Sequence, residues 1–194
     1  MPIGGATAMA RKRRELVIRT AKQLRALRTP LRQEIVRALT RLGAASVREL
    51  ADELGREPAT LYYHVHALVK AGLVRDDGLR KLGGRPEKLY SLVAQRILID
   101  RDSASRPFLS ALLELNRSTL RTAERELEAS VMARRTGEPD DTTMLLRLSS
   151  RLKPRDAARA AAMLRGALEF MAERDAPGSG DLHTVTVALV RTEE

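Results

Sequence analysis

Six polar or aromatic side chains close together in the chain have the chemistry to bind phosphates or base edges. They are Arg56, Thr60, Tyr62, Tyr63, His66 and Lys70. Hydroxyl and imidazole groups form hydrogen bonds with bases, and cationic groups neutralise phosphates. If residues 58–71 form a helix, most of this set falls about half a turn from an apolar stripe. That stripe consists of Leu61, Val65 and Leu68. The spacing therefore predicts a helix that buries one side and presents a polar one.

Two helices joined by a tight turn are expected to hold this face. Ser46 and Glu49 have the spacing of a capping box, which begins a helix. Gly55 can adopt the left-handed conformation that ends it, and Pro58 suits the first turn of the next helix. Two short helices with so brief a link describe a helix-turn-helix. The alternative is an ordinary helical hairpin within a core.

A β-hairpin is predicted directly after the second helix, from strands at residues 73–82 and 87–93. Gly83 and Gly84 tolerate the backbone angles of a hairpin tip, and Pro86 resists continuation of the strand pairing. Four basic residues lie at or beside this tip. They are Arg80, Lys81, Arg85 and Lys88. A basic hairpin behind such a helix is a wing that suits a minor groove, and a solvated hairpin is the alternative.

The positive charge of the chain is unevenly distributed. Residues 1–101 contain 21 Lys and Arg against 10 Asp and Glu, whereas residues 102–194 contain 14 against 15. The whole excess of the net charge of +10 therefore lies in the half that contains the predicted helix-turn-helix. Phosphate neutralisation gives a reason for this partition, and solubility alone does not.

The remaining N-terminal residues are expected to form an arm and further helices. Residues 1–19 are predicted to be a flexible basic arm, with a basic cluster at residues 11–14 that either touches DNA or is solvated. A helix from Thr20 to Leu27 and another from Pro30 to Leu42 should follow. We assign residues 20–101 to one winged helix-turn-helix domain. No signal peptide and no membrane-length apolar run is apparent, so a cytoplasmic protein is expected.

At this point the sequence resembles the ArsR-like winged helix-turn-helix transcription regulators. The resemblance runs from Gln23 to Leu92 and is carried by the segments QLRALRTPLRQEIVRAL, VRELADELGREPATLYYHVHALVKAGLV and GGRPEKLYSL. It implies a winged helix-turn-helix that binds double-stranded DNA. It also implies a homodimer on a palindromic operator and, commonly, repression relieved by an effector.

The chain departs from the metal-sensing members of that family. Their sites use Cys, His and carboxylates in clusters, and here there are no Cys and three His. His64 and His66 point in different directions from one helix, so they cannot chelate one ion together. We therefore expect no metal and no cofactor.

A long helix is predicted within residues 102–136. Between residues 107 and 135 a heptad pattern favours pairing with a second chain. Its seam residues are Leu109, Leu113, Asn116, Leu120, Ala123 and Leu127. The alternative is a helix that packs on its own winged domain. The expected fold is thus mainly α with a small β component: a winged helix-turn-helix, a long dimerisation helix, and a small α+β unit.

The last segment, residues 137–194, is expected to be that small α+β unit. Residues 143–149 are ambiguous and favour a strand, a helix should run from Pro154 to about Glu173, and residues 184–190 have the strongest strand pattern of the chain. No cluster of polar groups defines an effector pocket there.

Three functions are compatible with these features, and an enzyme is not expected. No phosphate-binding glycine loop, nucleophile–base pair or metal constellation appears. A homodimeric, sequence-specific transcription regulator, most simply a repressor, fits the helix-turn-helix and the charge partition. A low-specificity architectural DNA-binding protein is the alternative, favoured by 29 Arg among the 35 basic residues. A winged helix used for protein interaction is a third possibility, disfavoured by the charge partition.

Overall fold

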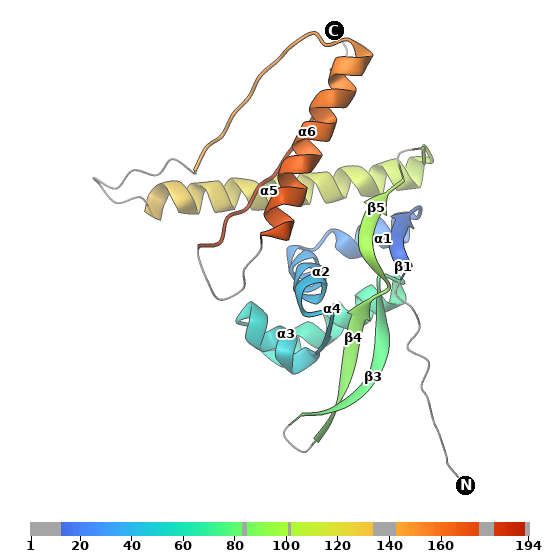
Figure 1. The fold of residues 1–194 in the computed structure, drawn as a ribbon. Coiled ribbons are helices and arrows are strands. Elements are labelled where there is room, and N and C mark those ends of the chain that lie inside the picture. The colour runs from blue at the N-terminus through green and yellow to red at the C-terminus, as the bar shows by residue number, and fades with distance from the viewer. Residues whose placement is uncertain (1–12, 83–84, 101, 134–142, 175–180, 193–194) are drawn as a thin grey trace. The chain divides into compact units, whose positions relative to one another are not determined.

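The computed structural model describes residues 13–82, 85–100, 102–133, 143–174 and 181–192 (Figure 1). The chain divides into two compact units, residues 1–122 and residues 123–194. Each unit is described by itself below.

The first four helices of unit 1 begin where the sequence has caps and prolines. They are α1 (Ala21–Leu27), α2 (Pro30–Leu42), α3 (Val47–Leu54) and α4 (Pro58–Lys70). Thr20 caps α1 by accepting a hydrogen bond from the Gln23 amide at 3.3 Å. Pro30 and Pro58 occupy the first turns of α2 and α4, where a missing amide proton costs nothing. All four helices were predicted from the sequence with nearly these bounds.

The predicted capping box of α3 is present. The Glu49 amide donates to Ser46 Oγ at 3.2 Å, and the Ser46 amide donates to Glu49 Oε2 at 2.8 Å. Loss of such a cap costs roughly 1 kcal/mol. Gly55 ends the helix with φ 59° and ψ 41°, the left-handed conformation that favours glycine. These two ends fix the orientation in which the chain enters α4.

A three-stranded antiparallel sheet with the order β2-β4-β3 completes the helix-turn-helix region. Its strands are β2 (Ala44–Ser46), β3 (Val74–Leu82) and β4 (Arg85–Leu92). The hairpin of β3 and β4 was predicted, and Val74 pairs with Leu92 at its base. The short strand β2 was not predicted, because three residues carry too little pattern. The predicted tip glycines, Gly83 and Gly84, lie outside the described residues.

Part of the predicted flexible arm is instead a strand. Residues 1–12 lie outside the described residues, but β1 (Arg13–Ile18) pairs in parallel with β5 (Ala94–Ile99). Ile18 is fully buried, and the Asp100 amide donates to its carbonyl at 3.0 Å. The expectation of an unstructured segment up to residue 19 was therefore wrong. Burial of the apolar residues of β1 stabilises this pairing.

The core of unit 1 is mostly aliphatic, in keeping with a chain that has two Phe and no Trp. Its largest fully buried side chains include Leu24, Ile35, Leu39, Leu50, Leu61, Val65, Leu68 and Leu73. Full burial of such a side chain stabilises the fold by roughly 1.5–3 kcal/mol. The stripe predicted on residues 61–68 is thus the side of α4 that packs inward. Phe108, from the start of the next helix, joins the same core.

The long helix α5 (Arg106–Ala133) begins in unit 1 and packs there through one side. Phe108, Ala111 and Leu115 are buried in the core. Ser118 Oγ donates to the Arg28 carbonyl at 2.6 Å, and Arg28 Nη1 binds Glu114 Oε2 at 2.8 Å. Packing on its own domain, one of the two expectations from the sequence, therefore describes this side of the helix.

The predicted heptad seam lies on a different side of α5. Leu109, Leu113 and Leu120 are 44%, 55% and 54% exposed, and Asn116 is exposed as well. The last two seam residues, Ala123 and Leu127, fall in unit 2 and are half-buried. An apolar stripe on α5 thus remains open to solvent in the single chain.

Unit 2 contains the end of α5 and the predicted helix α6 (Pro154–Glu173). Its two predicted strands are wrong: residues 143–149 and 184–190 are described, and neither forms a strand. An extended segment becomes a strand only when a second one supplies its hydrogen bonds, and no described residue does so here. The described part of unit 2 is therefore helical rather than α+β. Apolar side chains such as Leu145, Leu148 and Leu182 are exposed in its extended segments.

Candidate nucleic-acid interface

The turn between α3 and α4 sets the orientation of α4. The Arg56 amide donates to the Ala51 carbonyl at 2.9 Å and closes the end of α3. The Thr60 amide donates to the Glu57 carbonyl at 3.1 Å and opens α4. Arg56 is exposed in this turn. These two hydrogen bonds leave only a short link between the end of α3 and the start of α4.

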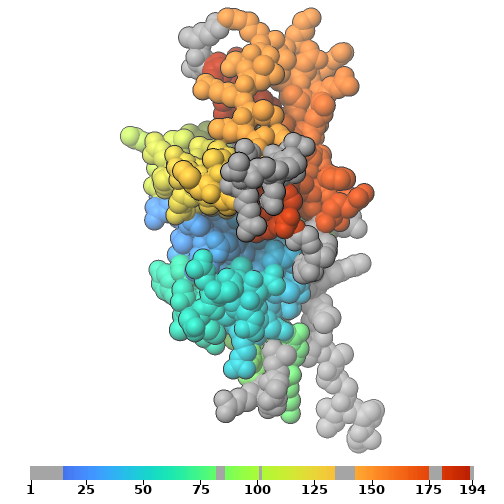
Figure 2. Space-filling view, turned by 90° about the vertical axis from the view of Figure 1, so that its left-hand side faces the viewer, coloured from blue at the N-terminus to red at the C-terminus, as the bar shows by residue number. Residues whose placement is uncertain are grey.

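The outer face of α4 is formed by the residues that the sequence singled out. Thr60, His66 and Lys70 are exposed, and Tyr62 and Tyr63 are 52% and 71% exposed. The space-filling view shows the teal surface of the helix-turn-helix, with the green hairpin projecting past its lower edge (Figure 2). The structure thus brings these five side chains together on one exposed surface.

One contact network behind α4 was not predicted. Arg32, from α2, donates through Nε to His64 Nδ1 at 3.3 Å and through Nη1 to the Ala26 carbonyl at 3.1 Å. Its guanidinium carbon lies 5.9 Å from the centroid of the Tyr63 ring, which meets the His64 ring edge-on at 5.4 Å. Arg32 therefore supports both aromatic side chains from below. No sequence pattern indicates this role for Arg32, because His64 lies 32 residues further along the chain.

A second contact joins α4 to the hairpin. The hydroxyl of Tyr90, a buried residue of β4, lies 3.5 Å from Nε2 of His66. Their ring centroids are 6.5 Å apart. The predicted DNA-contacting histidine is therefore exposed on one side and rests against Tyr90 on the other. Burial raises the pKa of the Tyr90 hydroxyl, which keeps it protonated.

The basic residues of the hairpin have different surroundings. Arg80 forms an ion pair with Glu49 of α3, and Lys88 Nζ lies 2.6 Å from Asp76 Oδ2. Lys81 is exposed. Arg85 begins β4 in register with Leu82, and its side chain lies outside what the structure describes. Two of the predicted phosphate contacts are thus paired with carboxylates in the single chain.

These pairings shift the pKa values of the groups concerned. The side-chain hydrogen bond from Lys88 lowers the pKa of Asp76, and the amide of Gly78, which donates to Asp76 at 3.1 Å, adds to the effect. The same hydrogen bond raises the pKa of Lys88. Both groups are therefore charged at neutral pH.

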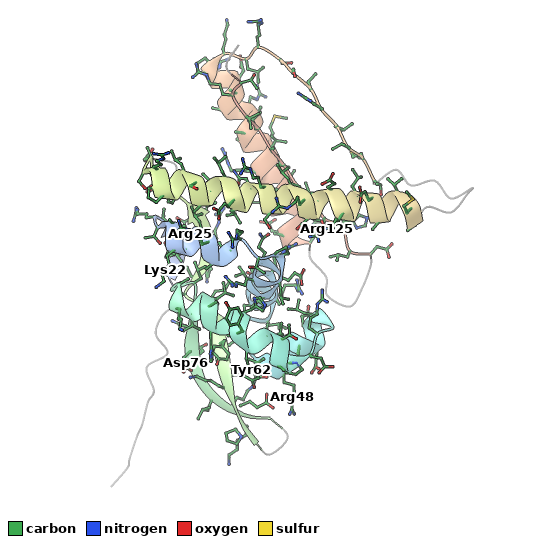
Figure 3. The ribbon with its side chains drawn as sticks, turned by 180° about the vertical axis from the view of Figure 1, so that it is seen from behind. Lys22, Arg25, Arg48, Tyr62, Asp76 and Arg125 are labelled. Carbon is green, nitrogen blue, oxygen red and sulfur yellow. The ribbon has the colours of Figure 1, made fainter. Side chains whose placement is uncertain are left out.

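Arg48, in the first turn of α3, is a further cation that the sequence did not single out. Its Nη1 lies 3.4 Å from Glu87 Oε1 of β4, and two thirds of its side chain is exposed. Arg48 and Lys88 line one hollow of about 300 Å³ together with Tyr62 and Tyr90. Arg48 and Tyr62 lie on the side where the two helices meet the hairpin (Figure 3).

The two histidines of α4 have separate partners. His64 is part-buried against Arg32, and burial lowers its pKa, with the positive charge of Arg32 adding to the effect. His66 contacts Tyr90. Within the described ranges, no group of three or more His, Cys, Asp or Glu could hold a metal ion. Within the same ranges, no helix is long and apolar enough to cross a membrane.

Comparison with known proteins identifies one segment of the chain. A family model described as a helix-turn-helix domain matches residues 27–77. This match extends from the end of α1 into β3 and includes α2, α3 and α4 in full. No match was found among curated proteins. Residues 27–77 are therefore a helix-turn-helix domain, the kind of domain that DNA-binding transcription regulators contain.

Proposed function

We propose that the protein is a sequence-specific transcription regulator, a homodimeric repressor of the ArsR-like winged helix-turn-helix type that binds a palindromic operator. In this proposal α4 is the recognition helix in the major groove and the β3–β4 hairpin is the wing. The proposed DNA contacts are Arg56, Thr60, Tyr62, Tyr63, His66, Lys70, Arg80, Lys81, Arg85 and Lys88.

The observation that carries the proposal is the two-sided character of α4. Leu61, Val65 and Leu68 are completely buried, whereas Tyr63 is 71% exposed together with its polar neighbours. Tyrosine, with an apolar ring and a polar hydroxyl, is enriched at interfaces with partners. A base edge in the major groove offers that ring and its hydroxyl both packing and hydrogen bonds.

The hairpin and the charge of the first half of the chain support the same partner. Residues 1–101 contain 21 Lys and Arg against 10 Asp and Glu, and they include the whole helix-turn-helix domain. A basic surface attracts DNA over a distance set by the salt concentration. In our proposal the wing adds phosphate or minor-groove contacts beside those of α4.

The exposed stripe of α5 supports a dimer. Leu109, Leu113 and Leu120 stand open on a helix whose other side is anchored in its own core. Pairing with a second copy would bury this stripe, and Asn116 within it would fix the register. A dimer would also bring two recognition helices to half-sites roughly 34–36 Å apart. Such spacing is what a palindromic operator requires.

Metal sensing is not part of the proposal. The chain has no cysteine, and His64 and His66 face different partners. The second candidate function is a low-specificity architectural DNA-binding protein. It is favoured by the abundance of arginine, 29 of the 35 basic residues, because arginine binds phosphate and minor groove without a preferred sequence.

Selection of bound sites from a random pool of DNA duplexes tests the proposal. A regulator should enrich one motif made of two inverted half-sites, since each subunit reads one of them. An architectural protein would enrich at most an A·T-rich or flexible composition with no fixed motif. Recovery of no DNA at low salt would reject both functions.

A further inference from the structure

A hollow between α3, α4 and β4 is lined by cationic side chains, which suit a phosphate better than a base edge. Arg48 and Lys88 both line it, one from α3 and the other from β4, and Glu87 of β4 lines it too. Tyr62, on the exposed face of α4, lines it as well, so the hollow opens beside the proposed recognition surface. Its volume of about 300 Å³ exceeds by far the roughly 30 Å³ that one water occupies in the liquid.

Both cations of the hollow are held by carboxylates that could release them. Arg48 Nη1 lies 3.4 Å from Glu87, and the Arg48 side chain is 67% exposed. Lys88 Nζ lies 2.6 Å from Asp76, and both of these side chains are about half exposed. The Lys88–Asp76 pair is exposed enough to stabilise the fold very little, whereas the Glu87 side chain is only 17% exposed. An incoming anion therefore meets two exposed cations. Lys88 can change partner at small cost, and Arg48 can do so at the larger cost of separating from the mostly buried Glu87.

We propose that this hollow receives one phosphate of the DNA backbone, and that Arg48 and Lys88 leave Glu87 and Asp76 to bind it. The proposal rests on the proposed function and deepens it. Tyr62 lines the same hollow, and in this proposal its hydroxyl donates to the same phosphate, which makes it a positioning contact rather than a base reader. In the free protein, Glu87 and Asp76 pair with Arg48 and Lys88 in place of the phosphate and keep both cations beside the hollow.

Exchange of a carboxylate for a phosphate predicts a different effect of charge removal on DNA binding than a merely structural ion pair does. If the Arg48–Glu87 pair only braced the hairpin against α3, removal of either charge would weaken DNA binding in the same way. If Arg48 changes partner, removal of the arginine and removal of the carboxylate have opposite effects. Loss of Arg48 deletes a phosphate contact, whereas loss of Glu87 deletes the competitor of the phosphate.

The test compares Arg48→Gln, Glu87→Gln, Lys88→Gln and Asp76→Asn in the full chain. Arg37→Gln, which removes an exposed charge from α2, serves as the matched control. Binding is measured over a series of salt concentrations, on a duplex with the selected site and on a scrambled duplex. A urea titration of each variant shows whether it folds as the parent does.

We expect Arg48→Gln and Lys88→Gln each to weaken binding roughly tenfold near 0.1 M salt and to lower the salt slope by about 0.9, on both duplexes. Glu87→Gln and Asp76→Asn should strengthen binding, by up to about fivefold. Arg37→Gln should leave the slope of the parent unchanged.

Two results would overturn the phosphate site while leaving the regulator intact. One is weaker binding in both members of a pair, because it assigns the pair a bracing role. The other is an unchanged salt slope in Arg48→Gln, because it leaves Arg48 on Glu87. Failure of the parent protein to bind either duplex at low salt is a third result, and it would reject the proposed function together with the site.

Discussion

Arg32 of α2 and His64 of α4 are joined by a hydrogen bond of 3.3 Å from Nε to Nδ1. Nδ1 accepts this bond only while it carries no proton, so the contact requires neutral imidazole. The His64 ring also meets the exposed Tyr63 ring edge-on, and Arg32 lies under that ring. One pair of residues therefore connects the packing of α2 to the outer face of α4.

Stability should depend on pH through His64. Burial, with the Arg32 charge adding to it, lowers the pKa of His64 in the folded state below its ordinary value of 6.5. As pH falls, His64 takes up its proton in the unfolded chain before it does so in the folded one. The contribution of His64 to the free energy of unfolding is therefore complete above pH 6.5 and decreases as pH falls towards the folded pKa. His64→Asn keeps an acceptor without a titrating group. We expect urea titrations to show a smaller loss of unfolding free energy from pH 7 to pH 5 in the variant. An equal loss in both proteins would contradict the neutral-imidazole contact.

Tyr63→Ala should distinguish base reading from positioning. If Tyr63 reads a base edge, the variant loses roughly 1–3 kcal/mol of binding free energy on the selected site and little on scrambled DNA. Fluorescence anisotropy with both duplexes measures the difference. Equal weakening on the two would mean that Tyr63 only orients the helix. Leu79→Ala, at an equally exposed apolar residue of β3, provides a control for loss of surface area.

The sequence predicted the helix-turn-helix well because its signals are local. The Ser46–Glu49 box, Gly55 and Pro58 each act within a few residues, and the structure has the expected caps and turns at all of them. The base of the β3–β4 hairpin was predicted for the same reason. Its two strands lie on either side of one turn.

The features that sequence reasoning missed depend on residues far apart in the chain. β1 pairs with β5 across some 80 residues, and no local pattern in Arg13–Ile18 reveals that partner. The reverse error occurred at residues 184–190, where β-branched residues favour a strand but no described segment pairs with them. In the candidate site, Arg48 was overlooked because Glu87, its partner, belongs to the hairpin. Residue propensity predicts local conformation, whereas strands and side-chain contacts also depend on partners far away in the sequence.

Arg85→Ala tests the wing. A guanidinium in a narrow minor groove or between phosphates needs no particular base, so binding should weaken alike on selected and scrambled duplexes. The salt slope should fall by about 0.9, one counterion's worth for one phosphate contact. Binding at several salt concentrations gives this slope directly. An unchanged slope would place the hairpin off the DNA.

Leu120→Glu tests the dimer. Leu120 is 54% exposed in the single chain, so a charge there should not disturb the fold of a monomer, but pairing would bury it unpaired. Sedimentation should show a folded monomer with much weaker binding to the selected site and most of its non-specific binding retained. Ser110→Glu adds the same charge at an exposed position of α5 outside the seam and should remain dimeric. A dimeric Leu120→Glu variant would place the interface elsewhere.

Sequence-specific binding by α4 is the central claim, and the ratio of two affinities tests it most directly. The parent protein is titrated, at one salt concentration near physiological strength, with a duplex that carries the selected site and with a scrambled duplex of equal length. A sequence-specific regulator should bind the selected duplex at least about a thousandfold more tightly. A ratio near one, with binding that simply disappears as salt is raised, would contradict the claim and leave an architectural DNA-binding protein.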